Sequence, residues 1–500
     1  MLGVAGAYLL RALAESGAVP RIAVVSAGIA YAFLWLVWAG LARKGPRFKS
    51  SIYACTSALI LAPMLWELTL DFHLLPASIT AAILCAYAAA ALALVWKREI
   101  VPVLRVSWIA AAGLSLALAI ASHALLPFVA ALLGLAMLSD LVPGRDRMPE
   151  IRWLVALATD AAIWILIYVY FNPQSAHPDY PQLSRVALVA PGVVVFALFG
   201  ASTILQTVAR RVRITAFAVV QTTIAFFLAA VSIADFAPAS SGTILGIASL
   251  VLAVACAAAV FLVFAGAEQA RSRAVFSAWC AALLLCGFWL CLPAGWAAAS
   301  LGSFAVIATV VGGRKGWISL QWYGAVFMIS AAAGSGLLKF AGNALAGSPA
   351  GAPALAEWFA AACAVACYAT TKPRAEEPRT IQALHLGLAT LATGAVTAFA
   401  AQGLVGLIAL RVIPEAHHLA FIRTLTLCAA ALALAFLGAQ WRRSELTRLG
   451  YVMLALVAVK LVAEDLRHGH LEYIAGSIFL FAVTLIAAPR VARVSQKALQ

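Results

Sequence analysis

The chain alternates between long apolar stretches and short polar breaks. Each apolar stretch runs for about twenty residues, the length of helix that crosses the hydrocarbon core of a bilayer once. Basic residues punctuate the chain in clusters, and two apolar stretches joined by a turn separate one cluster from the next. The pattern predicts an all-α, polytopic transmembrane helical bundle of about eighteen spans, arranged as about nine helical hairpins.

Each predicted hairpin lies between two basic clusters, and no soluble domain interrupts the series. The hairpins are expected at residues 1–42, 51–96, 101–142, 153–209, 214–267, 274–312, 317–371, 381–441 and 449–488, and a basic tail follows at 489–500. A single integral membrane domain is therefore predicted. Small residues crowd the spans, as in the run 331–336, and permit helices to approach closely.

The distribution of charge predicts the orientation of the hairpins. Most of the 34 Lys and Arg residues lie at the breaks between hairpins, whereas the turns within hairpins carry Pro, Gly, Asn, His or Asp. Positive residues concentrate in the cytoplasmic loops of membrane proteins. The basic breaks and both termini are therefore expected on the cytoplasmic side, and the turns within hairpins on the outer side.

Composition supports lipid as the solvent for most of the chain. Hydrophobic residues make up 65% of the 500 positions and charged residues 11%, whereas soluble proteins carry about 25% charged residues. So few charges cannot cover so large an apolar surface in water. The net charge of +15 resides in short clusters without a nucleic-acid-binding motif, so no nucleic-acid partner is expected.

Sequence motifs assign no catalytic chemistry. The nine cysteines lie in or beside apolar stretches, where they are expected to pack as small apolar residues; Cys363 and Cys367, one helical turn apart, could alternatively form a metal or redox pair. The chain has no phosphate-binding loop, no His-Glu-x-x-His and no Gly-x-Ser-x-Gly. No cofactor and no bound metal are predicted.

The outer ends of the last two hairpins are rich in polar residues. The candidate cluster comprises Arg411, Glu415, His417, His418, Arg423, Lys460, Glu464, Asp465, His468, His470 and Glu472. Because consecutive hairpins are usually neighbours, a basic group of 411–423 is expected to meet a carboxylate of 464–472. Lys460 and Glu464 lie one turn apart and can pair. Such a cluster is an ion-paired clamp, an interfacial rim, or a metal or acid–base site.

Asp160 is a candidate site inside a predicted span. It lies about 11 Å from the inner end of that span, at 1.5 Å per residue. An unpaired carboxylate at such depth costs about 2.5–3.5 kcal/mol on insertion scales, so residues of this kind are functional candidates. The alternative is a structural hydrogen bond to a Ser or Thr of a neighbouring helix.

Both ends of the chain resemble those of a known group of proteins. Leu9–Gly17 with Pro20-Arg21, and Lys460–Asp465 with Pro489-Arg490, are similar to stretches of a large bacterial family of predicted polytopic membrane proteins of unknown function. The resemblance implies a many-hairpin protein of the bacterial inner (cytoplasmic) membrane. It assigns no catalytic residue, because the family has no established activity.

The leading functional prediction is a non-enzymatic carrier or binder of an apolar or lipid-like molecule. That molecule would enter near the outer leaflet, beside the histidine-rich last hairpins. The alternatives are an outer-face enzyme acting on a lipid-linked envelope substrate and a scaffold subunit of a membrane complex. The expected partners are therefore membrane lipid, a lipid-like small molecule and other membrane subunits.

Overall fold

The computed structural model describes residues 20–41, 47–98, 101–141, 149–171, 180–237, 241–264, 269–346, 351–371, 379–409, 415–441, 443–465 and 470–497. Within these ranges the regular elements are all helices, which confirms the all-α prediction. Fourteen of the described helices are long and apolar enough to cross a membrane. The chain is thus a multi-pass membrane protein.

Four predicted crossings fall outside these fourteen helices. Leu125–Asp140 and Leu355–Thr370 are apolar but shorter, and Ile318–Gly334 with Leu337–Leu345 meets the same criteria only as a pair bent by 68°. The first part of hairpin 1–42 lies outside the described residues. Counting the bent pair as one span gives fifteen spans by length and composition.

The chain divides into two compact units. Unit 1 comprises Met1–Leu245 with Val263–Val275, and unit 2 comprises Gly246–Leu262 with Phe276–Gln500. The helices of unit 1 are α2 (Arg21–Leu41), α3 (Arg47–Leu70), α4 (Ala77–Arg98), α5 (Val101–Ala121), α6 (Leu125–Leu141), α7 (Pro149–Phe171), α8 (Arg185–Ile204), the π-helix η2 (Leu205–Ala209) and α9 (Ala216–Phe236).

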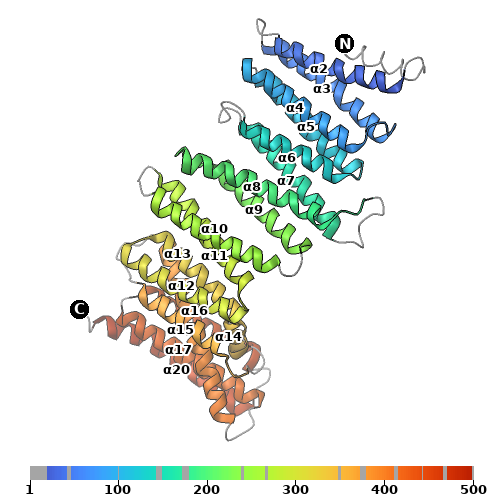
Figure 1. Cartoon of the computed structure of the whole chain (residues 1–500). Coiled ribbons are helices and arrows are strands. Elements are labelled where there is room, and N and C mark those ends of the chain that lie inside the picture. The colour runs from blue at the N-terminus through green and yellow to red at the C-terminus, as the bar shows by residue number, and fades with distance from the viewer. Residues whose placement is uncertain are drawn as a thin grey trace. The chain divides into compact units, whose positions relative to one another are not determined.

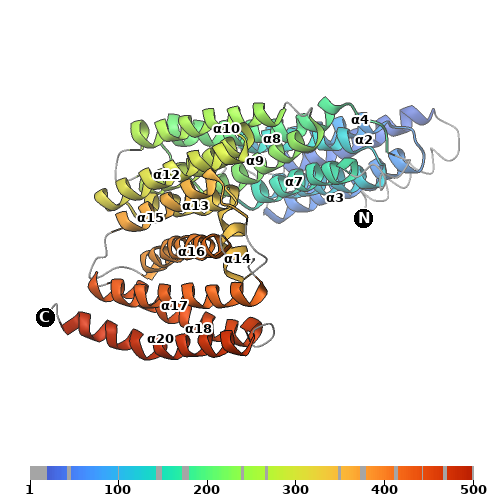
Figure 2. The same cartoon turned by 90° about the horizontal axis from the view of Figure 1, so that it is seen from below.

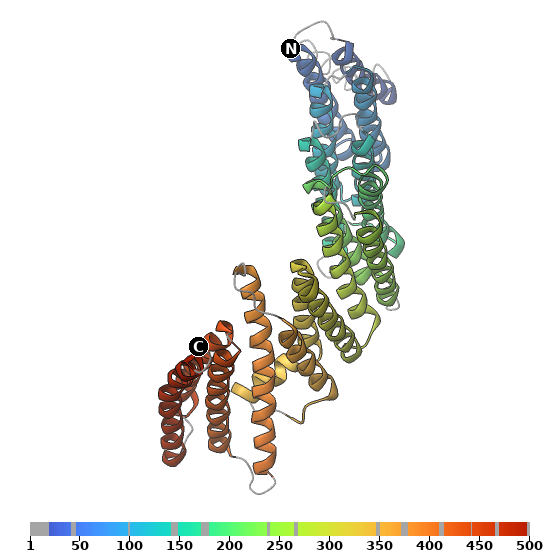
Figure 3. The ribbon, with the colours of Figure 1, turned by 90° about the vertical axis from the view of Figure 1, so that its left-hand side faces the viewer.

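Helices α2 to α9 stack in the order of the chain (Figure 1). Helices α2, α4, α6 and α8 contact one another in sequence and form one row, and α3, α5, α7 and α9 form the other. Figure 3 shows the two rows as two columns of helices. Large apolar side chains such as Trp108 and Phe128 fill the space between the rows.

Buried hydrogen bonds connect the helices of unit 1 through this apolar core. The Tyr87 hydroxyl donates to Ser57 Oγ at 3.1 Å, and Ser57 Oγ donates to the Ala32 carbonyl at 2.7 Å. Trp108 donates its indole N–H to the Ala88 carbonyl at 3.1 Å. In lipid, a polar group without a protein partner is costly, so each of these bonds fixes how one helix sits against the next.

Unit 2 contains most of three elements, α10 (Ser241–Ala258), η3 (Ala259–Val263) and α11 (Ala270–Cys291), while the first turn of α11 belongs to unit 1. The other elements of unit 2 are α12 (Ala294–Lys315), α13 (Ile318–Gly334), α14 (Leu337–Ala346), α15 (Leu355–Thr370), α16 (Arg379–Ala409), α17 (Ala416–Gln440), α18 (Ser444–Lys460), the π-helix η5 (Leu461–Asp465) and α20 (Leu471–Lys497). Helix α17 packs against both α18 and α20, and Figure 2 shows α17 and α20 side by side. Helix α16 contacts α14, α15, α17 and α18. It thereby connects the broken segment to the last hairpin.

The bend between α13 and α14 is built by small residues. Gly336 has a φ of +86°, a left-handed conformation that residues with a Cβ rarely adopt. A Cβ at Gly334 would lie 2.1 Å from the Trp289 ring of α11, so only glycine leaves space for that ring. Trp289 also donates its indole N–H to Ser330 Oγ at 2.9 Å. The run 331–336, which the sequence marks only as small, is where the helix turns aside.

Candidate functional site

Arg423 connects the last hairpins to the end of α14. Its Nε donates to the Ala344 carbonyl at 3.0 Å, and its Nη2 donates to the Asn343 carbonyl at 3.3 Å. The last four carbonyls of a helix have no partner within the helix, and the negative end of the helix dipole attracts a cation. Arg423 is only 5% exposed. Its guanidinium therefore caps α14 from inside the protein.

The same guanidinium binds a carboxylate from the next hairpin. Arg423 Nη1 lies 2.6 Å from Glu464 Oε1, and Lys460 Nζ lies 3.6 Å from Glu464 Oε2. Glu464 belongs to η5, the π-helix that directly follows Lys460 at the end of α18. A π-turn widens the helix and changes the direction of the side chains after it, and such turns are frequent at functional sites.

Lys460 completes this group, which we call the Arg423 cluster: Arg423, Lys460, Glu464 and the carbonyls of Asn343 and Ala344. Lys460 Nζ donates to the Ala420 carbonyl and, at 2.7 Å, to Thr424 Oγ1. The predicted meeting of a basic group of 411–423 with a carboxylate of 464–472 is confirmed, as is the Lys460–Glu464 pair. Every charge of the cluster has a partner inside the protein.

A group of aromatic rings lies nearby, where α17 and α20 begin. The ring of His417 lies 4.2 Å from that of His418, 4.7 Å from that of His470 and 4.8 Å from that of Tyr473, between centroids. His418 Nδ1 accepts from the Glu415 N–H at 3.3 Å, which caps the start of α17. His417 Nδ1 lies 3.4 Å from Glu415 Oε2.

The imidazoles of this group contact one another through their faces and edges. The rings of His417 and His418 are inclined by 36°, and those of His417 and His470 by 84°. Among the described residues, no three His, Cys, Asp or Glu side chains are placed to hold a metal ion. Glu472 lies exposed in the first turn of α20, while Arg411, His468 and the side chain of Asp465 lie outside the described residues.

Asp160 has one described partner, and it is an amide. Gln221 Nε2 of α9 lies 2.9 Å from Asp160 Oδ1 and 3.0 Å from Asp160 Oδ2. Asp160 is 8% exposed and Gln221 is 1% exposed. The structural alternative considered from the sequence was a hydrogen bond to Ser or Thr. The partner is instead Gln221, whose longer amide side chain bridges α7 and α9. This bond is a structural link between two helices of the same row.

Two arginines that the sequence marks only as orientation signals are buried. Arg443 donates to the Thr371 carbonyl and to Thr371 Oγ1, and lies 4.7 Å above the Tyr368 ring, so it caps the end of α15. Arg152 pairs with Asp140 at 2.9 Å and lies 4.3 Å from the centre of the Phe217 ring. Basic residues at span ends ordinarily face water, so the sequence alone does not predict that either arginine is buried.

Comparison with family models, curated proteins and solved structures gives no match for this chain. The resemblance of its two ends to a bacterial family therefore stays a prediction. What is known of the site comes from its own geometry.

The Arg423 cluster predicts a strong energetic coupling between α17 and η5. Glu464→Gln leaves the buried Arg423 guanidinium without a carboxylate, and Arg423→Gln leaves Glu464 with Lys460 alone at 3.6 Å. Breaking a buried ion pair costs about 3–5 kcal/mol, and we expect the larger loss for Glu464→Gln. Thermal or denaturant unfolding of the purified protein should show this loss for each single variant, and the double variant should lose less than the sum. Lys339→Gln, an exposed change on α14, is the control. Additive losses would refute the coupling.

The Asp160–Gln221 bond predicts a different result for polar and apolar substitutions. Asp160→Leu leaves the buried Gln221 amide without a partner, at a cost of about 1–3 kcal/mol. Asp160→Asn keeps an acceptor for that amide and should retain most of the stability. The double variant Asp160→Leu with Gln221→Leu removes both polar groups and should recover part of the loss. If unfolding of all three variants matched the wild-type protein, the bond would have no structural role.

Proposed function

We propose that the chain is a non-enzymatic membrane carrier or binder of an apolar or lipid-like molecule. The observation that carries the proposal is the broken span formed by α13 and α14, whose end is held by Arg423. Membrane carriers build their binding sites from discontinuous helices, because a helix that stops inside the protein exposes backbone groups and leaves room beside them. The proposed ligand-binding site would thus lie in unit 2.

Accessible helix surface on α14 and α16 supports this assignment. Gly342 of α14 and Gly403 and Gly406 of α16 lie exposed, and a Cβ added at any of them would meet no other atom within 4 Å, so a molecule could reach the surface of these helices. On the same two helices, Phe340 of α14 and Phe399 of α16 contact each other with ring centroids 4.9 Å apart, and Trp358 of α15 contacts Phe399 at 4.0 Å; both ring pairs are tilted. An apolar molecule in contact with α14 would lie next to aromatic surface and near the polar Arg423 cluster.

A second candidate function is that of a scaffold subunit. It is supported by the internal pairing of the Arg423 cluster, whose charges need no ligand to be satisfied. A cluster of this kind clamps helices together and can position a surface for another membrane subunit. The enzymatic alternative at the outer face stays a prediction.

Retention of a lipid-like molecule distinguishes the carrier from the scaffold. Gly342→Trp places a large ring on the exposed surface of α14, whereas Gly113→Trp places the same ring on the exposed surface of α5 in unit 1 and serves as control. Mass spectrometry of extracts from the purified proteins should find a molecule that the wild type and the control retain and that Gly342→Trp loses. Equal retention by all three proteins, with unchanged thermal unfolding, would contradict the carrier and favour the scaffold.

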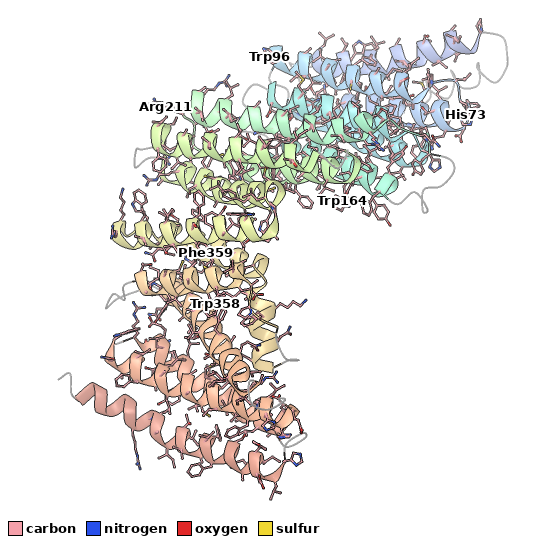
Figure 4. The ribbon with its side chains drawn as sticks, turned by 60° about the horizontal axis from the view of Figure 1, so that its bottom comes forward. His73, Trp96, Trp164, Arg211, Trp358 and Phe359 are labelled. Carbon is pink, nitrogen blue, oxygen red and sulfur yellow. The ribbon has the colours of Figure 1, made fainter. Side chains whose placement is uncertain are left out.

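The proposed location is a bacterial inner membrane with both termini in the cytoplasm. Figure 4 places Arg211 and Trp96 at one end of the helices of unit 1 and His73 at the other. The end that carries Arg211 would face the cytoplasm, because basic residues concentrate there. The histidine group of unit 2 would then lie at the outer face by the same rule.

Thiol labelling of intact cells tests this orientation. In a chain without its nine native cysteines, His73→Cys should react with a membrane-impermeant maleimide, and Arg211→Cys should react only after the membrane is opened. Both positions are exposed, so access depends on the side of the membrane. Reaction of Arg211→Cys alone in intact cells would reverse the proposed orientation.

A further inference from the structure

Five exposed arginines gather where two distant segments of unit 1 meet. The first segment follows η2 and carries Arg210, Arg211 and Arg213, and the second opens α11 with Arg271 and Arg273. The Ile214 N–H donates to Ser272 Oγ at 3.4 Å, and both residues are 2% exposed. We call this surface the five-arginine patch. Its two halves lie 58 residues apart in the chain and are connected by a buried bond.

Within the part of the chain that the structure describes, no negative charge balances the positive charge of the patch. Among those residues, no carboxylate lies in an ion pair with any of the five guanidinium groups, and the first turn of α11 holds no acidic residue. Arg271 and Arg273 occupy that turn, where the positive end of the helix dipole repels a cation. This arrangement disfavours the free protein and favours an anion at the patch.

The backbone at the centre of the patch is strained. Arg211 has a φ of +53°, which puts a residue with a long side chain in the conformation that glycine prefers after a helix. The Val212 N–H donates to the Gln206 carbonyl at 3.0 Å and the Arg210 N–H to the Leu205 carbonyl at 3.0 Å, and these bonds hold the turn. Glycine would fit this position with less strain, but it would remove the charge.

Exposed apolar side chains precede the first arginines of the patch and lie between them. Ile204 and Leu205 are each 52% exposed at the end of α8, and Val212 is 47% exposed between the arginines. Guanidinium groups bind phosphate through paired hydrogen bonds, and clusters of basic residues beside a span bind the headgroups of acidic lipids. A ligand that fits both surfaces carries phosphate and acyl chains together.

We propose that the five-arginine patch is a binding site for the phosphate headgroup of an acidic phospholipid. The guanidinium groups contact the phosphate, and the exposed side chains of Ile204, Leu205 and Val212 contact the acyl chains. The site lies in unit 1 and is independent of the proposed carrier function. One bound phosphate contacts arginines of both segments.

Lipid titration of the full-length chain in a neutral detergent tests the proposal, with phosphatidylglycerol as probe and phosphatidylcholine as reference. The wild type should bind phosphatidylglycerol in preference to phosphatidylcholine. Arg210→Gln and Arg271→Gln should each weaken phosphatidylglycerol binding about fivefold, as expected for one basic residue at a membrane surface. Arg185→Gln, exposed at the opposite end of α8, should leave binding unchanged.

Arg211→Gly separates binding from folding. It should match or exceed the wild type in thermal stability without lipid, because the strain is relieved, yet bind phosphatidylglycerol more weakly. Wild-type affinity in Arg210→Gln and Arg271→Gln would overturn the site. Inorganic phosphate or duplex DNA that displaces the lipid at matched phosphate concentration would overturn the lipid assignment and leave a general anion surface.

Discussion

A helix that ends inside a membrane protein leaves carbonyl groups without donors, and lipid supplies none. Unit 2 contains two short helices that face this constraint, α14 and α15, and a buried arginine satisfies each. Arg423 reaches the end of α14, and Arg443 reaches the end of α15. Both arginines belong to α17 or to the link that follows it, so the ends of α14 and α15 are both capped from the last hairpins. Glu464 then balances the charge that Arg423 brings into the interior.

Unit 1 meets the same constraint with less charge. One ion pair, Arg152–Asp140, connects α7 to α6, and neutral polar groups form further hydrogen bonds between neighbouring helices. Hydrogen bonds between membrane helices contribute about 0.6 kcal/mol each on average, far less than the cost of breaking a buried ion pair. The Tyr87–Ser57 and Asp160–Gln221 bonds therefore set the register of a stack whose stability comes from apolar packing.

The hydrophobic pattern and the chain connectivity predict much of this structure. The helical class follows from apolar length, and the Arg423–Glu464 and Lys460–Glu464 pairs follow from neighbouring hairpins and from one-turn spacing. The bend at Gly336 could not be predicted, because the neighbours that meet it, Trp289 beside Gly334 and Glu357 beside Gly336, come from distant helices. The Gln221 partner of Asp160 is 61 residues away, and Thr371 is 72 residues from Arg443. Periodicity carries no information on such distant pairs.

The Arg423 cluster and the five-arginine patch differ in whether their charges are paired within the chain. The Arg423 cluster gathers both signs of charge, buries them and leaves each with a partner, so its first effect is to hold helices together. The five-arginine patch gathers one sign, stays exposed and places two arginines against a helix dipole. Folding alone does not favour that arrangement, since a neutral side chain or a glycine would relieve the repulsion and the strain. This cost to the free protein, together with the exposed apolar side chains that neighbour the arginines in the chain, is what supports the proposed acidic phospholipid as a partner.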